Sequence, residues 1–270
     1  MKLKNKIAIV TGSSRGIGKE VAAELVREGA RVMLCARSEA ELKKAAADIG
    51  GSVAYCTVDV SDDTSVKKLV DTTLKKYGKI DILVTCAGIY GPMGEFHTQD
   101  IDAWNEAIDI NLLGTVRAIH AVIPHMKKNG GSIVALAGAG VPKPFPYFSA
   151  YSTSKAGIVQ LITGLAQEYT TIRFNAIAPG AVATKLIDEV IPAGPEKVGK
   201  EFYEQNKKWK KGEGGAVSPS IAAQFIVRLC ENTCTLTGKY LSAVWDTNLE
   251  GVSPELYTLQ RIDGRNFVKK

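Results

Sequence analysis

The sequence predicts an α/β fold, a doubly wound (Rossmann-type) three-layer sandwich around a seven-stranded, mostly parallel sheet. Short apolar runs alternate along the chain with longer segments of helical period, the order expected of a parallel sheet covered on both faces. A glycine-rich turn at 11–18 joins the first apolar run to the first amphipathic segment, as in a dinucleotide-binding unit. The length of 270 residues, with 45% hydrophobic and 23% charged side chains, suits one large domain spanning 1–270.

Seven apolar runs are expected to form the strands. The first, Lys6-Ile-Ala-Ile-Val10, is apolar at almost every position, as a strand buried on both faces should be. The predicted strands lie at 6–11, 31–35, 52–58, 81–85, 131–137, 172–177 and 239–243.

Six segments with a helical period are expected to cover the sheet. Ser38 and Glu41 form a capping-box pattern at the start of the second of them, and Gly29 and Gly78 stand where the first and third end. The predicted helices lie at 16–28, 39–48, 63–76, 99–127, 150–168 and 218–230.

The turn Thr11-Gly12-Ser-Ser-Arg-Gly16-Ile-Gly18 follows the first strand and opens the first helix. Glycines let the backbone turn tightly and let a phosphate approach it, while the helix N-terminus faces the pyrophosphate. The spacing is GxxxGxG, which differs from the GxGxxG of the general fingerprint. The turn taken alone therefore leaves two interpretations open, a nucleotide site or an ordinary glycine-rich βα turn.

A second motif, Tyr151-Ser-Thr-Ser-Lys155, places a phenol and an ammonium four residues apart, on one face of a predicted helix. A nearby cation favours phenolate and would lower the pKa of Tyr151 toward neutrality. Tyr151 would then exchange a proton with a substrate at ordinary pH. Such pairs are common on solvated helix faces, but together with the glycine turn this one indicates an active site.

With both motifs in place, the chain resembles the short-chain dehydrogenase/reductase family over residues 3 to about 244. The resemblance implies hydride transfer between nicotinamide C4 and a carbonyl or alcohol carbon, with Tyr151 as acid or base and a substrate-covering lid at 185–217. It also implies that Lys155 binds the nicotinamide ribose and that Asn111 holds a water linked to Lys155. The matching positions are Gly12, Gly16, Gly18, Asp59, Val60, Ala87, Gly88, Asn111, Tyr151, Lys155, Pro179 and Gly180.

The end of the second strand, Leu34-Cys35-Ala36-Arg37, bears on the choice of nucleotide. An acid there binds the 2′-hydroxyl of NAD, whereas an arginine accommodates the 2′-phosphate of NADP. Ala36 is no acid, Arg37 follows it, and Arg15 is a second cation within reach, so NADP(H) is expected in preference to NAD(H). The alternative makes Arg37 a surface residue at a strand end. The expected nucleotide-binding residues are Gly12, Ser14, Arg15, Gly16, Ile17, Gly18, Arg37, Asp59, Val60, Ala87, Gly88, Tyr151, Lys155, Pro179, Gly180 and Thr184.

One position departs from the family. Its members carry a serine about thirteen positions before the tyrosine, which donates a hydrogen bond to the substrate oxygen, and this chain has Gly138 there. Three explanations stay open: a backbone amide of the loop 138–140 replaces the hydroxyl, the substrate supplies its own polar groups, or the chain is a weak or inactive enzyme that binds NADP for another purpose. A second departure is Thr85-Cys86, where the family usually has two asparagines.

The expected substrate is a polar small molecule such as a sugar, a cyclitol or a nucleotide-linked sugar. The C-terminal extension at about 245–270 counts against an acyl-carrier-protein reductase, which usually ends near the last strand, so a 3-oxoacyl thioester reductase is the alternative. Six lysines within 197–211 would suit an anionic group, but interleaved glutamates fit a solvated helix as well.

Composition narrows the remaining classes. The net charge of +6 is mild and lies in no nucleic-acid motif, and the five cysteines form no CxxC pair, so neither nucleic acid nor metal is expected. No apolar run approaches the roughly 20 residues of a membrane helix, and the apolar stretch before Gly12 is too short for a signal peptide, which predicts a cytoplasmic protein without a membrane partner. Wide apolar stripes on helices 99–127 and 150–168 predict a homodimer or homotetramer.

Overall fold

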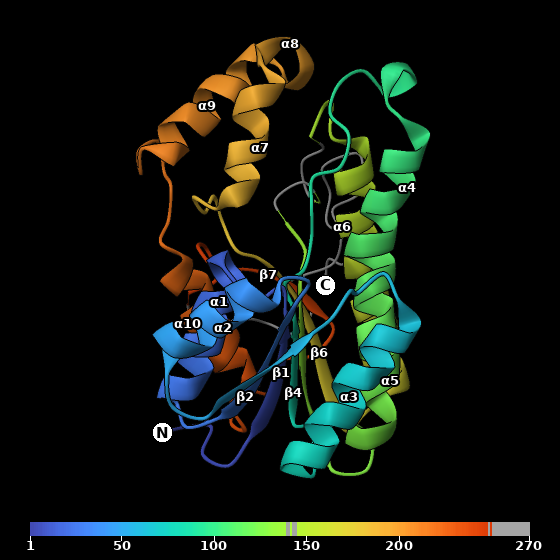
Figure 1. Ribbon diagram of the computed structural model, residues 1–270, viewed down its shortest axis with the longest axis vertical. Helices are drawn as coiled ribbons and strands as arrows, with labels where there is room; N and C mark the ends of the chain where they lie inside the picture. The colour runs from blue at the N-terminus through green and yellow to red at the C-terminus, as the bar shows by residue number, and fades with distance from the viewer. Residues whose placement is uncertain (139–140, 142–144, 248, 250–270) are drawn as a thin grey trace, which may run out of the picture.

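The computed structural model describes residues 1–138, 141, 145–247 and 249 (Figure 1). One sheet runs through the molecule in the order β3-β2-β1-β4-β5-β6-β7, and every neighbouring pair is parallel. The doubly wound α/β fold is thus confirmed, with a sheet that is parallel throughout. The strands are β1 (Ile7–Thr11), β2 (Arg31–Ala36), β3 (Val53–Thr57), β4 (Ile82–Thr85), β5 (Gly131–Leu136), β6 (Ile172–Ala178) and β7 (Lys239–Ser242).

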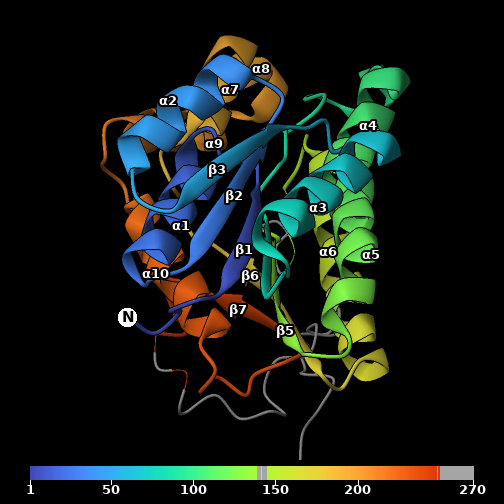
Figure 2. The same ribbon diagram turned by 60° about the horizontal axis from the view of Figure 1, so that its bottom comes forward.

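Helices cover both faces of this sheet, as the three-layer prediction requires (Figures 1 and 2). Each face has its own apolar cluster, and successive residues of one strand point to opposite clusters, as Ala8 and Ile9 of β1 do. On one face lie α1 (Gly16–Arg27), α2 (Glu39–Ile49) and α10 (Pro219–Cys230), and on the other α3 (Asp63–Tyr77), α5 (Gly114–Met126) and α6 (Ser149–Glu168).

The helix predicted at 99–127 is interrupted. It consists of α4 (Ile101–Ile108), a π-helical turn η2 (Asp109–Leu113) and α5, preceded by the 3₁₀ turn η1 (Phe96–Thr98). The π turn contains Asn111, and a π turn inserted into an α-helix is frequently found at a functional site. Apolar periodicity alone does not reveal such a local change of winding.

By length and composition, one helical stretch among the described residues could cross a membrane: Ile101–Met126, whose most apolar window has a mean hydropathy of 1.2. The sequence showed no contiguous apolar run of that length, because the apolar residues are spread through the stretch. Half of that window is buried inside the molecule, which is typical of a core helix.

The region 185–217, which the family resemblance assigns to a substrate-covering lid, is largely helical. It contains α7 (Lys185–Ala193), α8 (Pro195–Val198) and α9 (Lys200–Lys210). Gly194 and Gly199, both with φ of +81°, separate these helices, so that no helical period runs long enough to be recognised in the sequence. Apart from 245–247 and 249, the predicted C-terminal extension lies outside the described residues.

Candidate active site

A cavity of about 730 Å³ opens at the carboxyl ends of the strands, beside the point where the chain order reverses between β1 and β4. Open parallel sheets bind their ligands at this topological position. Every predicted nucleotide-binding residue lines this cavity except Gly180, which lines a neighbouring one. The fold therefore brings together residues that are spread over more than 170 positions of the sequence.

The glycine turn is built by close backbone approach. A Cβ atom at Gly12 would lie 2.8 Å from the Cα of Ala87, and one at Gly18 would lie 2.5 Å from the carbonyl oxygen of Gly12. Both distances are shorter than the contacts that Cβ atoms make in real structures, and both are to backbone that cannot easily shift, so only glycine fits. Helix α1 then begins at Gly16, and no side chain caps its first N–H groups. Uncapped N–H groups at a helix start suit a phosphate, so the turn fits a dinucleotide.

Two arginines border the cavity at the end of β2. Arg37 is exposed and makes no hydrogen bond or ion pair with any residue that the structure describes. Arg15 instead pairs with Glu41 at 3.1 Å, and Ser14 donates its hydroxyl to the same carboxylate at 2.9 Å. Glu41 lines the cavity, and the sequence indicated only a capping role for it. Of the two predicted phosphate ligands, Arg37 is the one available to a ligand.

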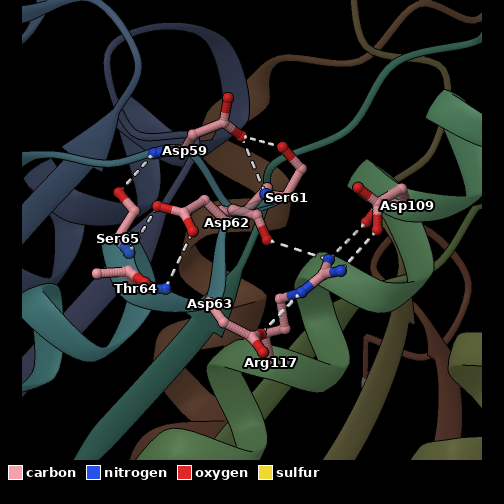
Figure 3. A network of polar contacts seen from close by, with 9 residues as sticks. Asp59, Ser61, Asp62, Asp63, Thr64, Ser65, Asp109 and Arg117 are labelled. Carbon is pink, nitrogen blue, oxygen red and sulfur yellow. Dashed lines mark hydrogen bonds and ion pairs between the residues drawn. The ribbon is translucent and has the colours of Figure 1, made fainter.

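The loop after β3 is held in shape by its own side chains (Figure 3). The carboxylate of Asp59 accepts hydrogen bonds from the backbone N–H of Ser61 at 2.9 Å and from its hydroxyl at 2.7 Å. The hydrogen bond from the Ser61 hydroxyl is the main reason that the pKa of Asp59 is lowered, and the nearby charge of Arg37 adds to it. Asp59 thus stays ionised at the edge of the cavity.

Arg117 of α5 ties this loop to the π turn (Figure 3). Its guanidinium contacts Asp109 at 2.7 Å and Asp63 at 3.0 Å, and it donates a longer hydrogen bond to the carbonyl of Val60 at 3.4 Å. Arg117 therefore links the loop after β3, which borders the first cavity, to the π turn that carries Asn111.

Asn111 is fully buried, and its side chain is satisfied by protein groups. Its Oδ1 accepts from the N–H of Ile89 at 2.8 Å, and its Nδ2 donates to the carbonyl of Ile89 at 2.8 Å and to Ser154 Oγ at 3.1 Å. It also lies near Lys155, because a Cβ at Gly88 would come within 3.0 Å of Asn111 Oδ1 and 3.6 Å of Lys155 Nζ. The Asn111 side chain thus joins the segment after β4 to α6.

Tyr151 and Lys155 lie on α6 as predicted, but their electrostatics differ from the expectation. Lys155 is buried and donates to the carbonyl of Leu136 at 2.9 Å, with its Nζ 5.6 Å from the centre of the Tyr151 ring. Burial lowers the pKa of Lys155 to about 8 and raises the pKa of Tyr151 to about 12. The predicted lowering of the Tyr151 pKa is therefore wrong for this arrangement, because loss of hydration on burial disfavours the charged phenolate.

The backbone of Gly138 lies directly against the phenol of Tyr151. A Cβ atom there would be 2.8 Å from the hydroxyl oxygen of Tyr151, so this hydroxyl occupies the space where a side chain would begin. The carbonyl of Gly138 accepts hydrogen bonds from the hydroxyl of Tyr240 at 2.7 Å and from the N–H of Val141 at 3.3 Å. Residues 139–140 of the predicted amide loop lie outside the described residues.

A second cavity, of about 1520 Å³, adjoins Tyr151 and has largely apolar walls. The Tyr151 ring meets the Tyr90 ring at a centroid distance of 4.9 Å, and Phe145 lies parallel to it at 6.5 Å. Phe202 and Trp209 of α9 continue this aromatic wall away from Tyr151. Sequence patterns did not identify these lining side chains, because they come from separate segments that carry no motif.

Among the described residues, the charged groups and thiols outside this site form neither an anion-binding surface on α9 nor a metal site. On α9, Lys207 pairs with Glu204 at 3.2 Å and Lys210 with Asp188 at 2.7 Å, which favours the solvated-helix interpretation of the lysine-rich stretch. All five cysteines are free. Within the described ranges, no group of three or more His, Cys, Asp or Glu side chains could hold a metal ion.

Comparison with known proteins adds independent findings. A family model described as short chain dehydrogenase matches residues 6–193. The uncharacterized oxidoreductase YxbG of Bacillus subtilis (strain 168) is 32% identical over 248 residues, 90% of each chain. An actinorhodin polyketide ketoreductase solved with NADPH superposes with a TM-score of 0.80 at 28% identity, covering 88% of this chain and 95% of that one. A 3-ketoacyl-(acyl-carrier-protein) reductase from Brucella melitensis, solved with NADH, gives 0.79 at 27% identity, covering 89% and 97%.

Proposed function

The chain belongs to the short-chain dehydrogenase family, and on that premise we propose that it is an NADP(H)-dependent oxidoreductase acting on a carbonyl or alcohol group. The observation that carries this proposal is that Tyr151 borders both cavities. One cavity is lined by the glycine turn and suits a dinucleotide, and the other is large enough for a substrate. A proton donor at their junction lies where a carbonyl oxygen would receive its proton.

The residues that would hold the nucleotide are those of the first cavity. The uncapped start of α1 would bind the pyrophosphate, Asp59 and Ala87 would border the adenosine, and Lys155 would bind the nicotinamide ribose. When bound, the nicotinamide supplies or accepts the hydride, while the protein supplies position and proton transfer.

NADP is preferred in this proposal because of Arg37. Its guanidinium is exposed at the cavity edge and has no partner among the described residues, and Ala36 beside it offers no carboxylate for a ribose hydroxyl. The related structures leave the choice open, since one holds NADPH and the other NADH. Tighter binding of NADH than of NADPH in a fluorescence titration would overturn this preference.

The raised pKa of Tyr151 suits the role of proton donor that reduction of a carbonyl requires. With a pKa of about 12, the phenol keeps its proton at neutral pH and is ready to donate it to a carbonyl oxygen. Oxidation of an alcohol would first require Tyr151 to lose that proton. We therefore propose that the enzyme acts as a carbonyl reductase.

The wall of the second cavity favours a bulky apolar substrate. The polar sugar expected from the sequence stays an untested prediction, and aromatic walls offer it few hydrogen-bonding groups. A flat or bulky ketone would instead bury apolar surface against Phe145 and Phe202. The second candidate substrate is a 3-oxoacyl thioester, whose apolar acyl chain would also fit this large, largely apolar cavity. The likeness to the Brucella reductase favours it as well.

Turnover of NADPH with 9,10-phenanthrenequinone tests the activity, with Tyr151→Phe as the diagnostic variant. We expect the variant to lose about 10³-fold in turnover, since general acid catalysis typically contributes 10²–10⁴-fold. Its affinity for NADPH, followed by cofactor fluorescence, should stay within about twofold, because the substitution removes only a hydroxyl. Full activity in the variant would contradict the role of Tyr151.

The other class of function, a non-catalytic NADP-binding protein, is motivated by Gly138 in place of the serine. It predicts tight NADPH binding without turnover across a panel of ketones, sugars and acyl thioesters. Turnover that Tyr151→Phe abolishes would exclude it.

We further propose a homodimer or homotetramer. Ile101 of α4 and Leu113 of the π turn are 57% and 40% exposed, so both offer apolar surface to a second copy of the chain. Light scattering that gave only the 28.9 kDa chain mass at micromolar concentration would refute this assembly.

A further inference from the structure

We propose that Tyr240 replaces the absent serine as the second hydrogen-bond donor to the substrate oxygen, an inference that rests on the proposed carbonyl reduction. Tyr240 lies on β7, more than a hundred residues from Gly138 in the sequence, yet its hydroxyl donates to the Gly138 carbonyl at 2.7 Å. It lines the same cavity as Tyr151.

The two phenols meet at the residue where the family carries its serine. The Tyr151 hydroxyl lies 2.8 Å from the position of a Cβ atom on Gly138, and the Tyr240 hydroxyl lies 2.7 Å from the carbonyl of the same glycine. Position 138 carries no hydroxyl of its own, but the hydroxyl of Tyr240 on β7 lies beside it.

The Tyr240 hydrogen can be redirected without moving the ring. Rotation about the C–O bond of a phenol carries the hydrogen from one of its two in-plane positions to the other, and hydroxyl hydrogens take whichever acceptor is present. The Gly138 carbonyl would keep a partner, because the N–H of Val141 also donates to it at 3.3 Å. A substrate oxygen bound between the two phenols could therefore accept from both, and no buried carbonyl would be left unsatisfied.

The two hydroxyls are suited to different tasks. Burial raises the pKa of Tyr240 well above its ordinary value, and negative charge on Tyr151 raises it further. When Tyr151 has given up its proton, Tyr240 therefore holds its own more firmly. In the reduction the carbonyl carbon gains the hydride, the carbonyl oxygen gains the proton of Tyr151, and Tyr240 contributes a hydrogen bond while keeping its proton. Solvent then reprotonates Tyr151.

The test is Tyr240→Phe, assayed with NADPH and 9,10-phenanthrenequinone. This substitution keeps the ring that packs against the sheet and removes only the hydroxyl. Loss of one preorganised donor to a developing oxyanion typically costs 10²–10³-fold in kcat, so we expect kcat to fall about 100-fold. KM should change by less than about threefold, and NADPH affinity should stay unchanged, because the donor acts mainly in the transition state.

Tyr169→Phe is the matched control. Tyr169 is partly buried, packs against the same apolar cluster as Tyr240, and lies outside both cavities. It should keep full activity. The double variant of Tyr151 and Tyr240 should be little slower than Tyr151→Phe alone, because groups that act on one oxygen lose their effects non-additively.

The outcomes separate this inference from the proposed function. If Tyr240→Phe kept kcat within twofold while Tyr151→Phe lost it, Tyr240 would have no catalytic role and the reductase would stand. A fall in thermal stability and NADPH affinity together with kcat, absent from Tyr169→Phe, would indicate a structural role and overturn the inference. Absence of turnover in the wild type, or full activity in Tyr151→Phe, would remove the proposed function itself.

Discussion

The two halves of the site that meet at Tyr151 are built from different parts of the chain. On the nucleotide side, the shape comes from backbone that approaches other backbone, at Gly12 against Ala87 and at Gly18 against Gly12. On the substrate side, the walls are side chains such as Phe145 and Phe202, contributed by the segment before α6 and by α9.

This difference bears on what each half can tolerate. At Gly12 and Gly18 a Cβ atom would lie only 2.5–2.8 Å from backbone atoms, so no residue other than glycine fits. In an aromatic wall, one side chain can be replaced by another of similar size. The nucleotide half should therefore be intolerant of substitution, and the substrate half adaptable.

The sharpest way to break the nucleotide half is Gly18→Ala. The new methyl group would stand 2.5 Å from the carbonyl oxygen of Gly12, so the turn must open and the start of α1 must shift. We expect the dissociation constant of NADPH to rise more than about 100-fold, since a displaced helix start loses its aligned N–H groups. Fluorescence titration measures it.

Gly164→Ala controls for the methyl group itself. Gly164 lies within α6, and a Cβ there would meet no atom within 4 Å. Alanine in a helix is favoured over glycine by about 0.5–1 kcal/mol, so this variant should bind NADPH normally and unfold slightly later. Equal NADPH affinity in the Gly18 and Gly164 variants would show that the turn does not shape the nucleotide site.

Gly138→Ala probes a described position where the substrate half also depends on the absence of a side chain. Its methyl carbon would come 2.8 Å from the Tyr151 hydroxyl, which must then move by several tenths of an ångström. A misplaced proton donor should lower kcat about tenfold, while NADPH affinity stays unchanged because the clash lies on the far side of Tyr151. Steady-state kinetics would measure the fall in kcat, and a binding titration would show whether NADPH affinity is unchanged. Unaltered kcat would mean that Tyr151 adapts without loss.

The comparison also explains which features could be predicted from the sequence. Gly12, Gly18, Tyr151 and Lys155 act through residue type and short spacing, both of which are local, and the structure brings them to one cavity. The predicted strand and helix positions agree with the observed ones within a few residues, because each element carries its own apolar period.

Two of the missed features depend on long-range packing. Tyr240 reaches Gly138 only because β6 and β7 pair beside β5, and nothing near Tyr240 in the sequence indicates that contact. The raised pKa of Tyr151 likewise follows from its burial, which a helical spacing to Lys155 does not reveal. Helices α7 and α8 were missed for a local reason, because Gly194 and Gly199 cut them too short to show a period, whereas the lysine-rich stretch of α9 was already considered as a solvated helix.

Arg37→Asp sharpens the comparison at the edge of the nucleotide half, where a side chain and not the backbone makes the contact. A carboxylate would repel the 2′-phosphate of NADPH and could accept the ribose hydroxyls of NADH. We expect NADPH affinity to fall about tenfold and NADH affinity to rise by a smaller factor, because one charge-assisted contact is exchanged. Titration of both nucleotides against both proteins measures the change. An unaltered ratio of the NADPH and NADH affinities would mean that Arg37 is a surface residue that does not contact the nucleotide.

Glu41→Gln is the companion variant for the second arginine. Glu41 holds Arg15 at 3.1 Å, so its neutralisation frees that guanidinium and removes a negative charge from the cavity. NADPH should then bind a few-fold more tightly. A weaker affinity would mean that Glu41 supports the turn instead of competing for Arg15.

The smallest expected effect is on the stability of the folded chain. It comes from Lys155→Met, a variant that should lose turnover but gain stability. Lys155 is buried, and its pKa is lowered to about 8 from an ordinary value of 10.5. The buried positive charge of Lys155 therefore lowers the free energy of unfolding at neutral pH. Lys155→Met removes that charge and should raise the free energy of unfolding at pH 7 by about 1 kcal/mol, although turnover is lost. The gain stays modest because the carbonyl of Leu136 loses the donor that lies at 2.9 Å.

The sign of its pH dependence follows from proton binding. Below pH 8 both the folded and the unfolded wild type carry the lysine proton, and the substitution relieves the full cost of the buried charge. Between pH 8 and 10.5 the folded wild type releases this proton while the unfolded chain keeps it, so wild-type stability rises with pH relative to the variant. Thermal unfolding of both proteins across this range should therefore show the advantage of Lys155→Met shrinking as pH rises. An advantage that stayed constant would mean that Lys155 does not titrate in this window, and its ammonium would then be better stabilised by the carbonyl of Leu136 than its burial implies.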